Sequence, residues 1–169
     1  MNTNNALRGL LSALTLAFIG LIAFSLRDSS AKEGDRAPDF SIRTDSGQQV
    51  SPLNFGGKVL VLNFWATWCP PCIQEIPSLN EFQKRFAHSG VVVLAVSVDK
   101  NAQKYHSFLE HVRVMFATAH DPNWDIGAEY GTFQIPETYI IKDGRVVRKF
   151  ISNQDWTSDE ITHYVESLL

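Results

Sequence analysis

The sequence predicts a single α/β domain, with a parallel core and an antiparallel hairpin at one side of the sheet. Two uninterrupted apolar and β-branched runs, 58–64 and 91–98, show the pattern of strands that are buried on both faces. Between them, apolar residues recur at spacings of three and four over 70–87, which indicates an amphipathic helix. Strand, helix and strand in this order predict a βαβ unit with a right-handed crossover.

The flanking segments predict the other elements of the domain. Residues 39–50 contain two short extended pieces around Asp45-Ser46-Gly47, a pattern typical of a hairpin. The stretch 138–150 is the clearest hairpin, because two strand-like runs flank Asp143-Gly144. Four further elements are expected, in the order helix (105–112), strand (114–120), short helix (122–130) and last helix (157–168).

The amino-terminal region predicts a membrane anchor. Residues 9–26 carry no charge, and as a helix they would span about 27 Å, close to the ~30 Å hydrocarbon core of a bilayer. A cleaved signal peptide is the alternative, although its apolar core usually has only about 7 to 15 residues. The expected divisions are therefore a short cytoplasmic N-terminus (1–8), a transmembrane anchor or uncleaved signal (9–26), a polar linker (27–37) and the folded domain (38–169). In either case the domain would be exported.

The charge balance argues against a nucleic-acid partner. The chain has 15 Lys and Arg against 18 Asp and Glu, a net charge of -3, and the basic residues form no run. Nucleic-acid binding depends largely on clustered Lys and Arg, so we expect no such partner.

Both cysteines of the chain lie in "WATWCPPC" (65–72). Three interpretations are open: a disulfide that braces the fold, half of a metal site, or a reversible redox pair. A disulfide between Cys69 and Cys72 closes a loop of four residues and removes little chain entropy, so it makes a poor brace. Structural zinc usually needs four Cys or His ligands, and we expect no metal site. The five histidines are scattered and supply no second pair at ligand spacing: His88, His106, His111, His120 and His163. A reversible redox centre remains.

The position of Cys69 favours redox chemistry. It lies between a buried strand and a helix, at about the N-cap, where the helix dipole and unpaired N–H groups favour a thiolate. Pro70 and Pro71 occupy the first two helical positions and have no N–H, which leaves the N–H of Cys72 as the nearest donor. We expect a thiolate that is only modestly stabilised, which is the property of a reductant.

The segment "VLVLNFWATWCPPC" resembles the active-site segment of the thioredoxin-like superfamily, and more narrowly its TlpA/ResA/CcmG (DsbE-like) group. The resemblance covers about residues 35–169 and includes "YGTFQIPETYIIKDGRVV", similar to a stretch of the CcmG branch. Gln134 stands where that branch usually has Gly, and Thr132 where it has Val. The group comprises membrane-anchored extracytoplasmic thiol–disulfide oxidoreductases, several of which reduce apocytochrome c.

The resemblance implies a fold, a function and partners. The fold would be thioredoxin-like, a central mixed sheet flanked by helices, with an N-terminal β-hairpin and an inserted helix and strand. The function would be reduction of protein disulfides in cytochrome c maturation, with apocytochrome c among the clients and no bound cofactor. Re-reduction would come from a membrane electron donor of the CcdA/DsbD type. The localisation would be the cell inner membrane, with the catalytic domain on the periplasmic side.

Three residues are candidates for the chemistry itself. Cys69 would attack, because the N-cap sulfur is the more exposed and the more acidic, and Cys72 would resolve the mixed disulfide. Glu75 lies at i+3 from Cys72, so its carboxylate could reach that thiol and exchange a proton with it. Its position matches the active-site Glu of the ResA type. The alternative is an acidic first-turn residue that complements the helix dipole.

The candidates for substrate binding surround the cysteines: Trp68, Pro70, Pro71, Ile135, Pro136 and Glu137. The thioredoxin-like pattern implies a cis Ile135–Pro136 bond, which would place the Ile135 backbone beside Cys69 for strand addition by a client. Glu137 would orient substrate or a proton, or else be a solvated edge residue. Trp68 would line the exposed rim, whereas Trp65 would lie in the core.

Two other functions can be built on the same fold. A peroxide-reducing enzyme would usually carry a Thr three residues before its reactive cysteine, and Ala66 stands there. A copper chaperone would use both thiolates with a distant histidine such as His120, but copper-carrying relatives generally have three residues between the cysteines.

Overall fold

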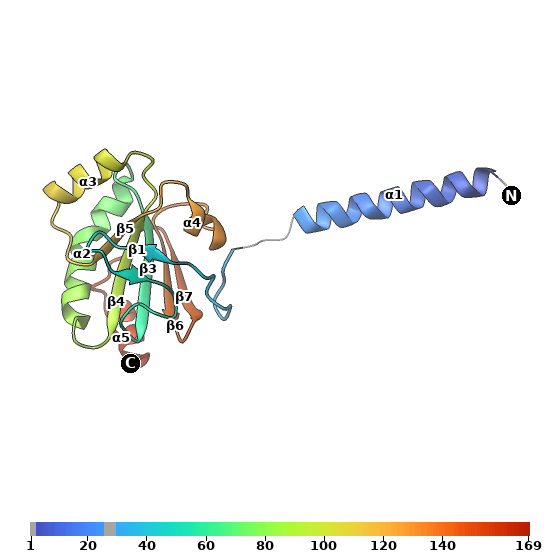
Figure 1. Ribbon diagram of the computed structural model, residues 1–169. Helices are drawn as coiled ribbons and strands as arrows, with labels where there is room; N and C mark the ends of the chain where they lie inside the picture. The colour runs from blue at the N-terminus through green and yellow to red at the C-terminus, as the bar shows by residue number, and fades with distance from the viewer. Residues whose placement is uncertain (1–2, 26–29) are drawn as a thin grey trace.

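The computed structural model describes residues 3–25 and 30–169 (Figure 1). Within these residues the elements, in chain order, are α1 (Thr3–Ser25), β1 (Ile42–Arg43), β2 (Gln49–Val50), β3 (Val59–Trp65), α2 (Pro70–Phe86), β4 (Val91–Ser97), α3 (Ala102–His111), β5 (Ala117–His120), α4 (Asp125–Glu129), β6 (Glu137–Lys142), β7 (Arg145–Ile151) and α5 (Asp159–Ser167). From β1 onwards this is the order that the sequence predicts.

β3 is the middle strand of a five-stranded mixed sheet with the order β5-β4-β3-β6-β7. β3 and β4 are parallel, with Val59 opposite Val91 and Trp65 opposite Ser97, and β4 is parallel to β5. β6 is antiparallel to both β3 and β7. The predicted parallel core and its antiparallel hairpin are therefore confirmed.

Alternate residues of β3 face two separate apolar layers, because successive side chains of a strand point to opposite faces. Val59 and Val61 pack with residues of α2 and α5 on one face of the sheet. Leu60, Leu62 and Phe64 pack in the cluster on the other face. Every residue of the strand is buried, the polar Asn63 included, as expected for a strand that is covered on both faces.

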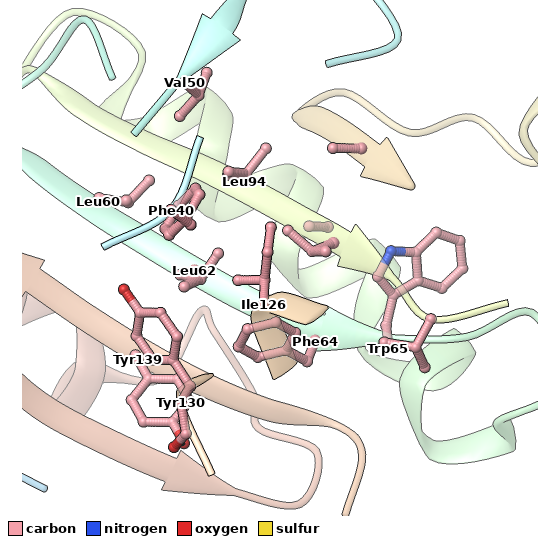
Figure 2. Close-up of a cluster of buried hydrophobic side chains, with 14 of the residues drawn as sticks. Phe40, Val50, Leu60, Leu62, Phe64, Trp65, Leu94, Ile126, Tyr130 and Tyr139 are labelled. Atoms are coloured by element: carbon pink, nitrogen blue, oxygen red, sulfur yellow. The ribbon is translucent and has the colours of Figure 1, made fainter. Parts of the chain in front are cut away.

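Figure 2 shows the second of these layers, which is rich in aromatic rings. The ring of Tyr139 lies 6.1 Å from that of Phe64 and 4.9 Å from that of Tyr130, both at steep angles. At the carboxyl end of β3, the Trp65 ring lies 5.4 Å from that of Phe108 in α3. Packing on this face therefore holds the end of the strand that leads into the cysteines.

The strand predicted over 114–120 is shorter in the structure and runs only over Ala117–His120. It is an edge strand that pairs with β4 over residues 94–97 alone. Before it, the N–H of Met115 donates to Asn80 Oδ1 of α2 at 2.7 Å, so the chain there bonds to a helix rather than to the sheet.

The amino-terminal region forms the helix α1, whose bounds include most of the predicted anchor. Residues 1–2 and 26–29, and with them the start of the predicted linker, lie outside the described residues. In the described part of the chain, no helix is both long enough and apolar enough to cross a membrane. The anchor over 9–26 stays a prediction.

Residues 30–37, expected to belong to the linker, instead contact the domain. The N–H of Ala31 donates to the carbonyl of Tyr130 at 3.0 Å, and that of Ala37 to the carbonyl of Gly144 at 2.9 Å. Both alanines are buried. Small side chains allow this segment to lie close to the domain, so the folded part begins before residue 38.

Candidate active site

A short loop connects β3 to α2 and carries the first cysteine. The N–H of Thr67 donates to Asp99 Oδ2 at 2.9 Å, and its hydroxyl donates to Asp99 Oδ1 at 2.7 Å. Ser97 Oγ donates to the same carboxylate at 2.7 Å. Asp99 follows β4, and the carboxyl ends of parallel strands meet at one edge of the sheet. Sequence reasoning missed Asp99, whose signal is a carboxylate directly after a buried strand.

Cys69 is the N-cap of α2, as predicted, and its sulfur accepts the N–H of Cys72 at 3.3 Å. Pro70 and Pro71 occupy the first two helical positions. The two cysteines form a disulfide, with their Cα atoms 5.3 Å apart. Cys69 is 4% exposed and Cys72 only 1%, so the N-cap cysteine is the more exposed of two largely buried residues.

The loop before β6 lies against the disulfide. The Ile135–Pro136 peptide bond is cis, as the resemblance implies. The Ile135 carbonyl oxygen is 3.7 Å from Cys69 Sγ. β6 then pairs with β3, with Glu137 opposite Phe64, so the central strand pair fixes this loop beside the cysteines.

The surface around the disulfide is aromatic. Trp68 is 66% exposed and lies on the rim as predicted, whereas Trp65 is buried. Pro70 is exposed and Pro71 half-buried. Phe133, which sequence reasoning did not single out, is 72% exposed and lies two residues before Ile135. Exposed rings therefore stand on both loops that flank the reactive sulfur.

Glu75 is buried beneath the first turns of α2 and is only 3% exposed. Its Oε1 accepts from the Asn63 side-chain amide at 2.7 Å. Its Oε2 accepts from the Gln154 N–H at 3.2 Å and from Trp156 Nε1 at 3.4 Å. The first turn of α2 holds no acidic residue, so the alternative of a first-turn acid that complements the helix dipole is wrong. The predicted contact between the Glu75 carboxylate and the Cys72 sulfur stays a prediction, because the hydrogen bonds of this carboxylate come from Asn63, Gln154 and Trp156.

The environment of Glu75 suits proton exchange near neutral pH. Burial raises the pKa of its carboxyl from 4.5 to about 7, because a buried charge loses its hydration. The hydrogen bonds from Asn63, Gln154 and Trp156 act in the opposite direction and limit the rise. Asn63 is the only polar residue of β3 and also donates to Thr138 Oγ1 at 2.9 Å, so it joins α2 to β6.

Glu137 is fully buried, so the prediction of a solvated edge residue is wrong. Its strand lies between β3 and β7, and neighbours therefore cover it on both sides. Glu137 Oε1 forms an ion pair with Lys149 Nζ at 2.7 Å and accepts from the Tyr139 hydroxyl. Its Oε2 has no hydrogen-bond partner among the described residues. Any effect of Glu137 on substrate must act through its neighbours.

His120, the histidine considered for copper, is already engaged. Its ring stacks on that of Tyr105 at 4.7 Å, and its Nε2 lies 2.5 Å from the Asp99 carbonyl oxygen. Within the described ranges, no three His, Cys, Asp or Glu side chains gather in an arrangement that could hold a metal ion.

Comparison with known proteins finds relatives with the same chemistry. The AhpC/TSA family model matches residues 33–150. The chain is 33% identical to the thioredoxin-like protein YneN of Bacillus subtilis over 84% of this chain and 86% of the relative. It is 28% identical to the thiol-disulfide oxidoreductase ResA of Bacillus thuringiensis over 92% of each.

A solved structure, a thiol:disulfide interchange protein DsbE from Chlorobium tepidum, superposes with a TM-score of 0.75 at 29% identity. The match covers 82% of this chain and 99% of that one. The predicted thioredoxin-like fold and the resemblance to the TlpA/ResA/CcmG group are confirmed. With its disulfide at a helix N-terminus beside a cis-proline loop, the protein is a thiol–disulfide oxidoreductase, and the chain belongs to the AhpC/TSA family.

Proposed function

We propose that the protein reduces disulfides of other proteins outside the cytoplasm. The observation that carries the proposal is the Cys69 sulfur at the N-cap of α2, beside the Ile135 carbonyl and directly after the exposed Trp68 in the chain. A client that pairs with the backbone at residue 135 by strand addition would bring its own disulfide to this sulfur.

The exchange would take two steps. The Cys69 thiolate attacks one sulfur of the client disulfide, forms a mixed disulfide and expels the other client sulfur as a thiolate. The Cys72 thiolate then attacks the Cys69 sulfur and releases the second client thiolate. Two electrons pass to the client, and the 69–72 disulfide re-forms, which is the state of the structure.

Cys72 must lose a proton before the second step, and Glu75 is the candidate acceptor. It lies one helical turn beyond Cys72. A general base works best when its pKa lies near the working pH, and the pKa of about 7 for this buried carboxyl meets that condition.

The weak stabilisation of the Cys69 thiolate supports the reducing direction. The first two helical residues are prolines and donate nothing, and the N–H of Cys72 lies at 3.3 Å from the sulfur. A dithiol whose reduced form is little stabilised gives up its electrons readily. We expect equilibration with dithiothreitol buffers, quantified by thiol alkylation, to give a potential below the about −180 mV of protein disulfide isomerase. A value near about −120 mV, typical of strongly oxidising disulfides, would exclude the reductant role.

The proposal extends to the membrane and to cytochrome c maturation. The uncharged run 9–26 supports an anchor in the inner membrane, and apolar side chains of α1 such as Leu16 and Phe18 are exposed. The resemblance supports apocytochrome c as a client and a CcdA/DsbD-type membrane protein as the electron donor. If the anchor is real, alkaline carbonate should leave the full chain in the membrane fraction and release a chain that starts at residue 30.

Peroxide reduction remains the alternative activity on this fold. Ala66, which is fully buried, stands where those enzymes usually have a Thr, so the loop lacks that hydroxyl. Rapid consumption of peroxide by the reduced protein would favour this alternative.

A further inference from the structure

A groove of about 610 Å³ opens beside Trp68, the residue before the attacking cysteine. Trp68, Val98, Pro122 and Trp124 line it with apolar surface. Val98 follows β4, and the other two follow β5. The groove therefore lies at the carboxyl ends of the parallel strands, at the same edge of the sheet as Cys69.

Trp124 forms a preformed wall of this groove. Its backbone has φ 65°, and its ring packs against the backbone of α4 at Gly127. A Cβ at position 127 would lie 2.8 Å from the ring, so only glycine allows this contact. Because the Trp124 ring is already held in place, binding of a client would not have to fix its conformation.

The exposed charge of the groove is positive, although the chain as a whole has a net charge of -3. Lys100 and Lys104 line the groove, both exposed and neither in an ion pair with a described residue. Asp99, which lines the groove, and Asp121, which precedes the lining residue Pro122, are buried and already bonded, whereas Asp125 is exposed but does not line the groove. Asp99 holds the loop before Cys69, and Asp121 accepts the N–H groups of residues 125–127.

We infer that this groove binds the client segment beside the disulfide and favours segments that carry an apolar residue together with an acidic one. The inference rests on the proposed function, because it names the clients that the exchange at Cys69 would select. The lining residue Trp68 directly precedes Cys69, and an extended chain advances about 3.3 Å per residue, so client side chains two to four residues from its cysteine would lie about 7 to 13 Å along this side of the site. The apolar one would bury against Trp68 and Trp124, and the carboxylate would meet the lysines.

Peptide disulfides test this selection. Two dimeric peptides would carry Leu-Asp or Leu-Lys at the second and third positions from a single cysteine and otherwise be identical. At about 0.15 M salt, the reduced full-length protein should reduce the Asp peptide roughly threefold to tenfold faster than the Lys peptide, the range expected for one or two exposed ion pairs. This ratio should fall towards one in about 1 M salt, where the Debye length is only ~3 Å.

Lys100→Glu and Lys104→Glu should each reduce or reverse the ratio of the two rates. Both peptides react with the same cysteine, so any effect of these substitutions on its reactivity cancels in the ratio of the two rates. Lys58→Glu is the matched control, because Lys58 precedes β3 at the opposite end of the sheet. Seven strand residues place it about 23 Å from the cysteine loop, more than two Debye lengths at about 0.15 M salt, so the ratio should be retained.

A third peptide, with Ser in place of Leu, tests the apolar wall. Trp68→Ala should remove most of the advantage of the Leu peptide over the Ser peptide. Equal rates for Asp and Lys peptides in the unmodified protein, or a preference that survives both glutamate substitutions, would overturn the inference.

The neutral hydroxyethyl disulfide separates this inference from the proposed function. A reduced protein that cannot reduce it would contradict the proposed function. Reduction of it without any preference among the peptides would overturn the inference alone.

Discussion

The buried carboxyl of Glu75 should make the stability of the oxidised protein depend on pH. Its pKa rises from 4.5 to about 7 on folding because burial disfavours the charged form. Between these pH values the folded state holds a proton that the unfolded state has released. The contribution of Glu75 to the free energy of unfolding is therefore highest below pH 4.5, falls as the pH rises, and levels off above about pH 7.

The size of this fall follows from the two pKa values. Each pH unit between them costs about 1.4 kcal/mol, so the loss between pH 4 and pH 8 is about 3 kcal/mol. Glu75→Gln removes the titration, and other groups titrate equally in both proteins. The unfolding free energy of Glu75→Gln minus that of the unmodified protein should therefore rise by about 3 kcal/mol from pH 4 to pH 8.

Urea unfolding of both proteins at intervals from pH 4 to pH 8 measures this difference. The disulfide must stay oxidised, so that neither cysteine titrates. A difference that stays constant with pH within about 0.5 kcal/mol would refute the reasoning, because Glu75 would then titrate alike in the folded and unfolded chain.

Three further substitutions test the packing and polar contacts around the site. Asn63→Ala removes a hydrogen bond that favours the ionised form of Glu75, so the midpoint of the same pH dependence should move upward; an unchanged midpoint would contradict this. Lys149→Met should lower the free energy of unfolding by about 3 kcal/mol, because Glu137 is left buried without its cation. If urea denaturation gives a decrease below about 1 kcal/mol, the ion pair contributes little to stability. Phe82→Ala should cost about 3 to 5 kcal/mol with an unchanged m-value, since this ring fills the layer between α2 and α5; a smaller loss would indicate that the layer collapses around the cavity.

Local patterns were sufficient to predict the cysteine site. The apolar run before Cys69, the two prolines after it and the amphipathic helix beyond them all act within a few residues along the chain. Together they predict an N-cap sulfur whose nearby donor is the Cys72 N–H, and the structure has this contact.

Contacts between distant segments could not be predicted in the same way. A solvated edge position is one of two predictions for Glu137, because the sequence does not reveal that its strand lies between β3 and β7. The partner of Glu75 could have been found, because Val59 and Val61 of β3 face α2 and Asn63 is the next residue on that face. The groove beside Trp68 forms where the loops after β4 and β5 meet, so it depends on strand order.

The central claim is that Cys69 is the sulfur that attacks the client, with Cys72 acting only afterwards. The direct test compares Cys72→Ser with Cys69→Ser, each incubated as the reduced full-length protein with the same peptide disulfide. Mass spectrometry of acid-quenched samples measures the mixed disulfide with time. The account predicts that the adduct forms at least about tenfold faster on Cys72→Ser, which keeps the N-cap sulfur. Faster adduct formation on Cys69→Ser, or no adduct on either variant, would contradict it.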